Sequence, residues 1–359
     1  MSVKWNNKYM FSIIFIFWIT LLPLVFWNGA YEGPKVFWFL IGGVGIVVFW
    51  LYRVLWKKKN FILSKIDLFY FLWLGILLIS SIFGVHVFES IVGGSYRHQG
   101  VIFFFLLWLV KKTVEILEPI KRKLLMKCVA ISVVLECAVV IIQLVFGKMY
   151  FGKPLGSLGE ANAVAGFLVI GSFFVYEYLS KLVLLIPIIA LVVTQSRTGV
   201  LAGLMIFGNL INNIGVKTKI VLWSLLFLVT SLGLMVLTGQ KGNSPIENRS
   251  LVWKLGVDQI VNKPILGYGA ESGEVVYETA FRNYGLPLYN LIVDRSHNLF
   301  IDVAMWSGLF GLVVFFVWLL LSYKNLTTIT KKFAFFSFLI YSFFQPLSIA
   351  HWILFFLLL

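Results

Sequence analysis

Apolar segments follow one another along the whole 359-residue chain, separated by connectors that are mostly short. A helix needs about 20 apolar residues to cross the hydrocarbon core of a bilayer. The pattern therefore predicts an all-α polytopic membrane protein with about 12 transmembrane helices, in a range of 10–12. We place the spans at 10–27, 36–55, 66–85, 100–113, 124–146, 163–180, 182–195, 198–214, 219–238, 297–321, 333–345 and 350–359.

The composition supports the same class of protein. Hydrophobic residues make up 60% of the chain and charged residues 13%, whereas soluble domains contain roughly 45–50% and about 25%. A soluble domain of this length has too little interior to bury so much apolar surface. The composition also excludes a disordered chain and a disulfide-stapled secreted module. It makes nucleic acid an improbable partner, despite a net charge of +15.

The positions of the 30 basic residues predict the orientation of the chain in the membrane. Nineteen of them lie in one set of alternate connectors, five in the opposite set of short connectors, and six in the long connector 239–296. Basic segments resist translocation, so the basic-rich set is predicted to face the cytoplasm. Both termini are then cytoplasmic, and the connector 239–296 lies outside.

This assignment divides one integrated domain into three parts. Residues 1–238 form a nine-span N-terminal membrane region, 239–296 a long outer loop, and 297–359 the C-terminal spans. Within the loop, the segment 244–247 resembles a helix-capping box, and an amphipathic helix is predicted to follow from Pro245 to Asn262. Its apolar face is expected to comprise Trp253, Val257, Ile260 and Val261.

Three arginines gather on the predicted outer side, namely Arg197, Arg249 and Arg295, with Arg97 and Arg282 on the same side. Interfacial arginines commonly do no more than anchor helix ends. Arg197 is harder to explain in this way, because its connector is minimal and both flanks are apolar. A charge held so close to hydrocarbon costs a few kcal/mol and usually has a function.

A histidine opens the first C-terminal span. A lone histidine at a helix start is most often structural, so His297 is a candidate for chemistry only together with its neighbours. Asn298 and Asp302 are four residues apart and share a helix face, and Asp302 lies one turn inside the span, where a carboxylate is expensive. Gly308 and Gly311 are expected to allow close helix packing.

Two further sets of polar residues stand out. The outer connector that leads into the span at 163–180 is rich in glycine and ends in Glu160 and Asn162, at the mouth of that helix. A plain turn and a ligand-binding turn are both compatible with the pattern. Glu136 is an acid in the middle of a span without an evident partner, and its role is left open.

The chemistry that these residues permit requires no metal. The sequence contains no Asp-x-Asp pair, no zinc-spaced His/Cys cluster and no phosphate-binding glycine loop. Histidine is a usable base at neutral pH. Arginine side chains neutralise a leaving pyrophosphate by bidentate contacts. A lone histidine with several arginines thus fits proton abstraction from an alcohol, coupled to departure of a pyrophosphate.

The sequence resembles the O-antigen ligase and polymerase family of bacterial membrane sugar transferases. His297, Asn298, Gly308 and Gly311 match every fixed position of the family pattern His-[Asn/Ser/Gln]-x9-Gly-x2-[Gly/Thr/Tyr]. Arg197 followed by Leu201 matches the shorter pattern Arg-x3-Leu. The resemblance covers roughly residues 150–311, including two stretches that look like those of the family, with Arg249, Trp253, Pro264, Gly267 and Gly269 in one and Gly156 to Asn162 in the other.

The resemblance implies a multi-span, GT-C-like glycosyltransferase architecture in the bacterial inner membrane, with its active site on the outer face. The implied donor is a glycan on undecaprenyl pyrophosphate, the acceptor is a glycan, a lipid or a protein, and no cofactor is required. His297 would activate the acceptor hydroxyl, while Arg197 and Arg249 hold the diphosphate. Arg295 is a weaker candidate for the same task, and Asn298, Asp302, Glu160 and Asn162 are supporting residues.

An alternative function remains open at this point. A flippase for lipid-linked oligosaccharides, or another multi-span transporter, would suit about 12 spans with acids inside the membrane at Glu136 and Asp302. Against it, the unusual polar residues gather at one face instead of the midplane, and no inverted repeat is visible. Membrane lipids are partners under either hypothesis.

Overall fold

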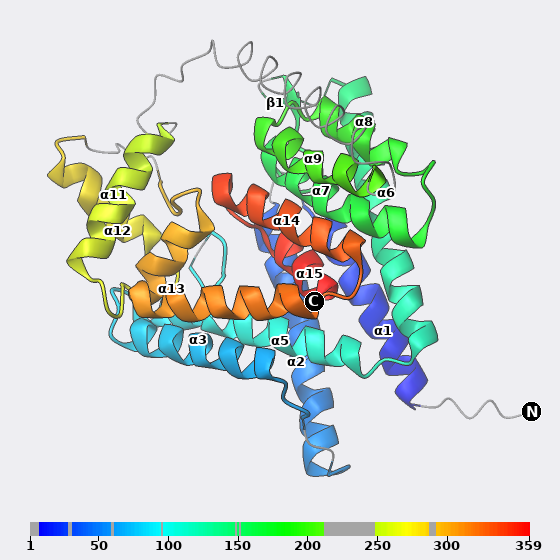
Figure 1. Cartoon of the computed structure of the whole chain (residues 1–359), viewed down its shortest axis with the longest axis horizontal. Coiled ribbons are helices and arrows are strands. Elements are labelled where there is room, and N and C mark those ends of the chain that lie inside the picture. Colours follow the sequence, from blue (N-terminus) through cyan, green and yellow to red (C-terminus); the bar gives the residue numbers. More distant parts are fainter. Residues whose placement is uncertain are drawn as a thin grey trace, which may run out of the picture.

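The computed structural model describes residues 7–27, 31–58, 61–94, 96–147, 149–150, 152–211, 248–286 and 292–359. The first half of the chain is helical except for one short hairpin of two strands (Figure 1). Its elements are α1 (Asn7–Leu21), η1 (Leu22–Leu24), α2 (Glu32–Leu55), α3 (Lys65–Ile82), α4 (Val87–Val92), α5 (Val101–Glu115), α6 (Pro119–Val145), β1 (Met149–Tyr150), β2 (Lys153–Pro154) and α7 (Ala161–Tyr178).

The second half is helical throughout its described part and completes the bundle around α7. Its elements are α8 (Leu185–Val193), α9 (Arg197–Leu210), α11 (Arg249–Asn262), α12 (Gly273–Asn283), α13 (Leu299–Asn325), α14 (Ile329–Phe344) and α15 (Ile349–Leu358). Helices thus occupy every predicted apolar segment except 219–238, which lies outside the described residues, as does the proposed capping box at 244–247.

Five helices in the described part of the chain, α2, α3, α6, α7 and α13, are long and apolar enough to cross a membrane. The protein is therefore a helical membrane protein, as the sequence predicts. The remaining apolar helices are shorter, for example nine residues in α8 and ten in α15. The exact number of spans and the cytoplasmic position of both termini stay predictions.

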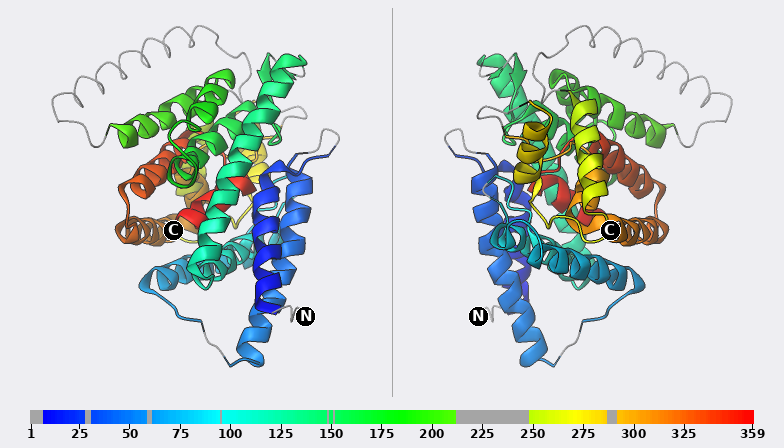
Figure 2. Two further views of the ribbon diagram at one scale, coloured as in Figure 1. Left: turned by 90° about the vertical axis from the view of Figure 1, so that its right-hand side faces the viewer. Right: turned by 90° about the vertical axis from the view of Figure 1, so that its left-hand side faces the viewer.

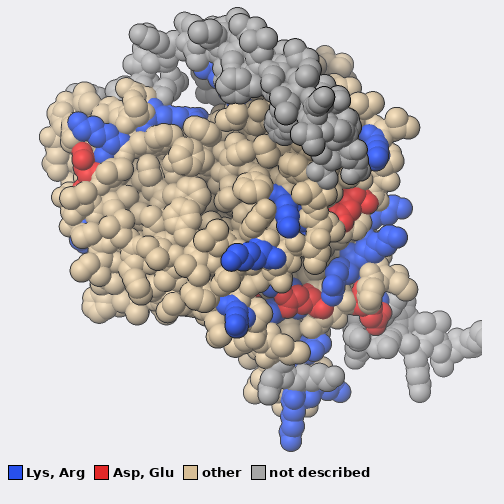
Figure 3. Space-filling model, viewed as in Figure 1, with Lys and Arg blue, Asp and Glu red and all other residues tan. Residues whose placement is uncertain are grey.

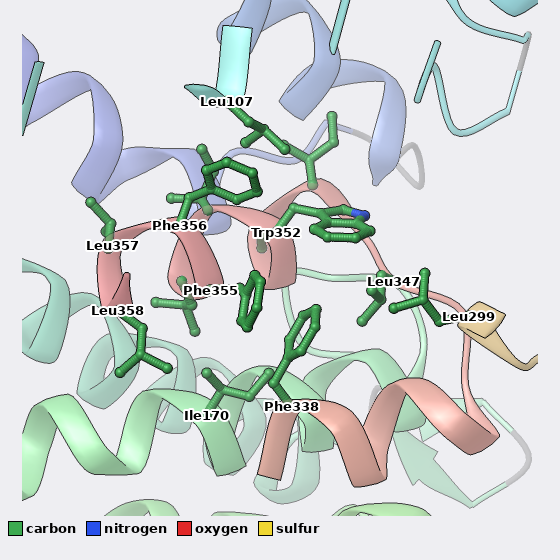
Figure 4. Close-up of a cluster of buried hydrophobic side chains, with 14 of the residues drawn as sticks. Leu107, Ile170, Leu299, Phe338, Leu347, Trp352, Phe355, Phe356, Leu357 and Leu358 are labelled. Carbon is green, nitrogen blue, oxygen red and sulfur yellow. The ribbon is translucent and has the colours of Figure 1, made fainter. Parts of the chain in front are cut away.

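The helices form two groups with α15 between them. In Figure 1, α3 and α13 run side by side along one edge, and α6, α7 and α9 lie together on the other side. The turned views in Figure 2 show α1 and α2 alongside each other, with α2 extending below the rest of the molecule. All ten residues of α15 are buried, as expected for a helix that is apolar on every side. Trp352, Phe355 and Phe356 pack there against neighbouring helices (Figure 4).

Charged side chains are concentrated away from a broad uncharged surface. Figure 3 shows this uncharged surface over much of one face, with basic side chains gathered toward the lower end of α2 and the start of α6. Inside that region, Asp67 pairs with Lys112 at 2.7 Å and accepts a hydrogen bond from the Trp108 indole at 2.9 Å. Lys112 is almost fully buried, so this ion pair fixes α5 against α3.

The helix α13 is broken at Gly308, which has φ 69° and ψ 180°. Residues 264–269 fill the break and satisfy its free backbone groups. The Leu309 N–H donates to the Pro264 carbonyl (2.8 Å), and the Tyr268 N–H donates to the Met305 carbonyl (2.7 Å). The sequence predicts close helix packing at Gly308 and Gly311. At Gly311 an added Cβ would lie 2.2 Å from the Ser307 hydroxyl of the same helix and 3.3 Å from Ile76 of α3, so the space is limited on both sides. At Gly308 the stronger requirement is the conformation itself, which only glycine adopts easily.

Replacement of Gly308 by alanine is expected to destabilise the protein by about 3 kcal/mol or more. The new Cβ would stand 1.9 Å from the Ile265 carbonyl oxygen, in a backbone conformation that is nearly exclusive to glycine. We expect the melting temperature in detergent to fall by about 5 °C or more. Gly75→Ala is the matched control in α3, because no atom lies within 4 Å of its added Cβ. Equal melting temperatures for the two variants would contradict this explanation of Gly308.

The helix α11 begins at Arg249, and the side chain of Asn248 caps it by accepting from the Leu251 N–H (3.3 Å). The apolar face predicted for this helix is only partly correct. Its buried residues are Val252, Leu255, Gly256 and Ile260, which pack toward α12 and α13. Val257 and Val261 are exposed, and they border an apolar groove shared with α13 and Phe343 of α14. The helix therefore has two apolar faces, because its neighbours cover a face that the simple periodicity does not identify.

Candidate functional site

His297 lies in the loop that leads into α13. Its backbone has φ 58°, a left-handed conformation that non-glycine residues adopt rarely and at a cost. Its neighbours hold it there. The Ser296 N–H donates to Asp302 Oδ1 (2.8 Å), the Trp253 indole donates to the Ser296 carbonyl (2.9 Å), and the Asn298 side chain caps the first turn of α13. Asn298 and Asp302 therefore position the loop that carries His297.

The imidazole of His297 is half-buried, and its Nδ1 atom is buried without a hydrogen-bond partner among the described residues. Burial lowers the pKa of His297 from its ordinary value of 6.5. The positive charges of Arg249 and Arg97 lower this pKa further, against smaller opposite effects of Asp294 and Glu160. The side chain is therefore neutral at pH 7 and able to accept a proton.

Arg249 provides positive charge near this histidine, and Arg197 lies near Arg249. Arg249 opens α11, and its guanidinium donates to the Phe344 carbonyl at the end of α14. Burial lowers the pKa of Arg249; Glu160 raises it and Arg197 lowers it, so these charges lie within electrostatic range of one another. Within the ranges that the structure describes, no carboxylate forms an ion pair with Arg197 or Arg249. Both charges are thus available to an anion.

Glu160 and Asn162 lie at the start of α7 and connect it to α9 and α14. Asn162 donates to Glu160 Oε1 (3.0 Å) and accepts from the Ser196 hydroxyl (2.7 Å). The Tyr341 hydroxyl donates to the Asn162 carbonyl (3.0 Å). Ser196 in turn caps α9, accepting from the Gly199 N–H (3.2 Å) just beyond Arg197. Asn162 therefore positions the start of α9, where Arg197 lies. Glu160 supplies an exposed carboxylate beside Asn162.

The C-terminal end of α14 is the meeting point of these elements. Tyr341 binds the start of α7, and Phe344 accepts from Arg249 at the start of α11. The Gln345 amide donates to Thr198 in the first turn of α9 (3.3 Å). The start of α13 joins them through the contact of Trp253 with the histidine loop. Four helix N-termini thus converge on one region, and each carries a partial positive charge.

Two other arginines nearby are already paired. Arg295 is buried, forms an ion pair with Glu271 and lies over the Trp306 ring at 4.6 Å. Arg97 forms an ion pair with Asp294. Burial raises the pKa of Asp294, but Arg97 and Arg295 lower it more, so that its net pKa lies below the ordinary value and the carboxylate stays ionised. Arg295 and Arg97 consequently hold the loop before His297 in place.

Strained backbone is concentrated in the same region. Among the described residues, five that are not glycine have a positive φ. Four of these are Gln195, His98, Glu271 and His297, with φ between 52° and 58°. Gln195 lies two residues before Arg197, and His98 follows Arg97 directly. Glu271 is the ion-pair partner of Arg295, and His297 is the candidate base itself. Such strain persists only where the surroundings enforce it, and it is typical of functional sites.

Sequence analysis did not select Arg97, Asp294 and Tyr341 as site residues. Arg97 and Asp294 had a usable signal, since each is a charge beside an apolar segment on the predicted outer side. Tyr341 had none, because it lies in an aromatic-rich span and acts through a partner 179 residues away. The same limit applies to Glu136, whose carboxylate accepts from the Ser157 N–H (2.8 Å) and hydroxyl and so anchors the connector before α7.

The described residues contain no group of three or more His, Cys, Asp or Glu side chains placed to hold a metal ion. The fold and the site instead define a helical membrane protein in which a neutral histidine, in a strained loop, lies beside unpaired arginines at the starts of helices.

Comparison with known proteins shows which family the chain resembles. A family model described as O-antigen ligase matches residues 182–316, which include Arg197, Arg249, Arg295 and His297. The ComP-specific O-oligosaccharyltransferase of Acinetobacter baylyi (strain ATCC 33305 / BD413 / ADP1) is 24% identical over 194 residues, covering 47% of this chain and 35% of that protein. The chain thus spans about a third of the length of this relative. The resemblance to the O-antigen ligase family is confirmed.

Proposed function

We propose that the protein transfers a glycan from undecaprenyl pyrophosphate to an acceptor hydroxyl, with inversion at the anomeric carbon and without a metal ion. The observation that carries the proposal is the half-buried, neutral His297 within electrostatic range of Arg249, which in turn neighbours Arg197. The O-antigen ligase match and the name of the relative, an oligosaccharyltransferase, support transfer of a glycan.

His297 serves as the general base in this proposal. It removes the proton from the acceptor hydroxyl as the oxygen forms a bond to the anomeric carbon. The bond from that carbon to the diphosphate oxygen breaks, and undecaprenyl pyrophosphate leaves with the electron pair. A neutral imidazole is required at the start, and the lowered pKa of His297 keeps it in this form at pH 7.

Arg197 and Arg249 bind the diphosphate and stabilise the charge that develops on it. Guanidinium groups make bidentate hydrogen bonds to phosphate oxygens. The N-terminal ends of α9 and α11, where these two arginines lie, add partial positive charge of the kind that binds phosphates elsewhere. Arg295, the weakest of the predicted phosphate ligands, is assigned a positioning role because Glu271 and Trp306 already occupy its guanidinium.

The transporter alternative loses its main support. It rested on about 12 spans and on acids inside the membrane at Glu136 and Asp302, but Glu136 accepts from Ser157 and Asp302 accepts from Ser296. Each carboxylate thus holds a loop.

We propose that the protein lies in the bacterial inner membrane and that the candidate site faces the outer side of that membrane. The charge pattern of the connectors supports this orientation.

Purified protein in detergent, given a glycan on undecaprenyl pyrophosphate and an acceptor, should release undecaprenyl pyrophosphate in equal amount to the glycan attached. Addition of EDTA should leave the rate unchanged, because Arg197 and Arg249 neutralise the diphosphate. Loss of activity in EDTA that Mg²⁺ restores would contradict the metal-free mechanism. Accumulation of donor inside sealed vesicles without covalent transfer would favour a transporter. Parallel assays with glycan, lipid and protein acceptors separate polymerase, ligase and protein-glycosylating activities.

A further inference from the structure

A polar cavity adjoins the candidate site but is not lined by its histidine or by its two unpaired arginines. It has a volume of about 320 Å³ and lies between the start of α2, the segment before α5, the start of α7 and the turn before α15. Pockets that bind small ligands have similar volumes, about 300–1,000 Å³. Its polar lining consists of Tyr31, Glu32, Tyr96, Arg97, Glu160 and Ser348.

The Glu32 carboxylate has unused hydrogen-bonding capacity. It interacts with the Ile349 N–H, but its Oε2 atom is buried without a partner among the residues that the structure describes. Lys35, one turn away, does not supply one. Its ammonium group donates to the carbonyls of Val25 (2.8 Å), Tyr31 (3.0 Å) and Ser157 (2.6 Å), which uses all three of its donors. A buried, unpaired carboxylate oxygen is costly and indicates a partner that comes from outside the chain.

The charges of the cavity differ from those of the diphosphate region. Arg97 is neutralised by Asp294, and the nearby Lys35 ammonium donates to three backbone carbonyls. The lining therefore offers a diphosphate no free cation, whereas the oxygens of Glu32 and Glu160 can accept hydrogen bonds from hydroxyl groups. Tyr31 and Tyr96 add rings that combine an apolar face with a polar hydroxyl. A ligand with several hydroxyl donors and apolar ring faces fits this lining, and a sugar residue has both.

We propose that this cavity binds a sugar residue of one of the two glycan substrates, with Glu32 and Glu160 accepting hydrogen bonds from its hydroxyl groups. The proposal rests on the glycan transfer proposed above and assigns the place of the sugar. Arg97 and Glu160 line the cavity and also act electrostatically on His297. A sugar bound there lies beside the base, while the diphosphate is held on the other side by Arg197 and Arg249.

Equilibrium binding tests this assignment without depending on catalysis. Soluble monosaccharides and short oligosaccharides, including N-acetylglucosamine, glucose and galactose, are added to detergent-solubilised full-length protein carrying His297→Ala, and binding is followed by saturation-transfer NMR. We expect at least one sugar to bind, and Glu32→Gln to weaken its binding by about 10- to 100-fold, the effect of losing a charge-assisted hydrogen bond. The exposed Glu274→Gln on α12 is the matched control and should leave binding unchanged.

Several outcomes decide the proposal. Unchanged binding in Glu32→Gln, or Glu32-dependent binding of a lysine-rich peptide in place of any sugar, would overturn it. Tyr96→Ala is a second variant at a 60% exposed side chain, where the fold is not at risk, and should also weaken sugar binding.

In transfer assays, Glu32→Gln should raise the KM of one glycan substrate with little change in kcat. A raised donor KM places the donor sugar in the cavity, and a raised acceptor KM places the acceptor there. Sugar binding is measured without glycan transfer. A protein that binds sugar in the cavity but does not transfer glycan would therefore contradict the proposed function and not the proposed sugar site.

Discussion

Replacement of His297 by asparagine should reduce kcat/KM for glycan transfer by about 10³-fold while the protein remains folded. A general base contributes roughly 10²- to 10⁴-fold to a rate. Asparagine is chosen because it tolerates the left-handed conformation that His297 adopts at φ 58°. The substitution removes the imidazole and keeps the backbone preference, so that loss of activity reports the chemistry and not a disturbed loop.

The control is His86→Asn, at an exposed histidine before α4. This variant should transfer glycan at the wild-type rate. Melting temperatures of both variants should match that of the wild type within a few degrees. Transfer by the His297 variant at a rate near the wild-type value would show that the histidine is not the base.

The pH dependence follows from the same group. The base must be unprotonated, so activity falls as the pH drops through the pKa of His297. Burial, together with Arg249 and Arg97, places that pKa below 6.5. We therefore expect the decline of kcat/KM with falling pH to have its midpoint below pH 6.5, measured with donor below its KM. A decline centred above pH 6.5 would contradict the burial and charges that the structure assigns to this histidine.

Most helices of the fold could be predicted from the sequence because they follow from their own apolar segments, whereas α4 and α12 correspond to no such segment. The broken helix α13 shows the limit of that reasoning. Its hydrophobic pattern is continuous through Gly308, and only the turn segment from Pro264 to Gly269, which inserts at the break, explains why a glycine is required there. The buried face of α11 was misjudged for a related reason. Which side of a helix is covered depends on where its neighbours pack.

The candidate site was predictable where a residue stands out locally. His297 and Arg197 interrupt apolar sequence, and polar residues in such positions are expensive enough to be informative. Pairing between distant segments was not predictable. Nothing near Arg295 indicates that Glu271 neutralises it, and nothing near Glu136 indicates Ser157 as its partner. Only the structure shows which arginines are neutralised by a partner and hold the fold, and which remain available to a ligand.

Arg249→Ala should raise the KM of the undecaprenyl-pyrophosphate donor and lower kcat/KM by about 10- to 150-fold. This range corresponds to the loss of one charge-assisted hydrogen bond, about 1.5–3 kcal/mol. Arg249→Lys keeps the charge but not the bidentate geometry, so it should recover only part of the loss. The matched control is Arg282→Ala on α12, an exposed arginine that pairs with Glu278 at 2.8 Å, and it should behave as the wild type.

Arg249 also donates to the Phe344 carbonyl, so its loss could act through the structure alone. A second measurement separates this structural role from binding of the donor diphosphate. The positive charge of Arg249 lowers the pKa of His297 in addition to burial. Removing that charge makes protonation of the imidazole easier, so the pKa rises and the acidic limb of kcat/KM moves to higher pH. Arg249→Lys should leave the limb near its original position, because the charge remains. An Arg249→Ala variant that loses activity with an unshifted acidic limb would show that Arg249 acts only by supporting α14, and that it neither faces the base nor shares a pocket with it.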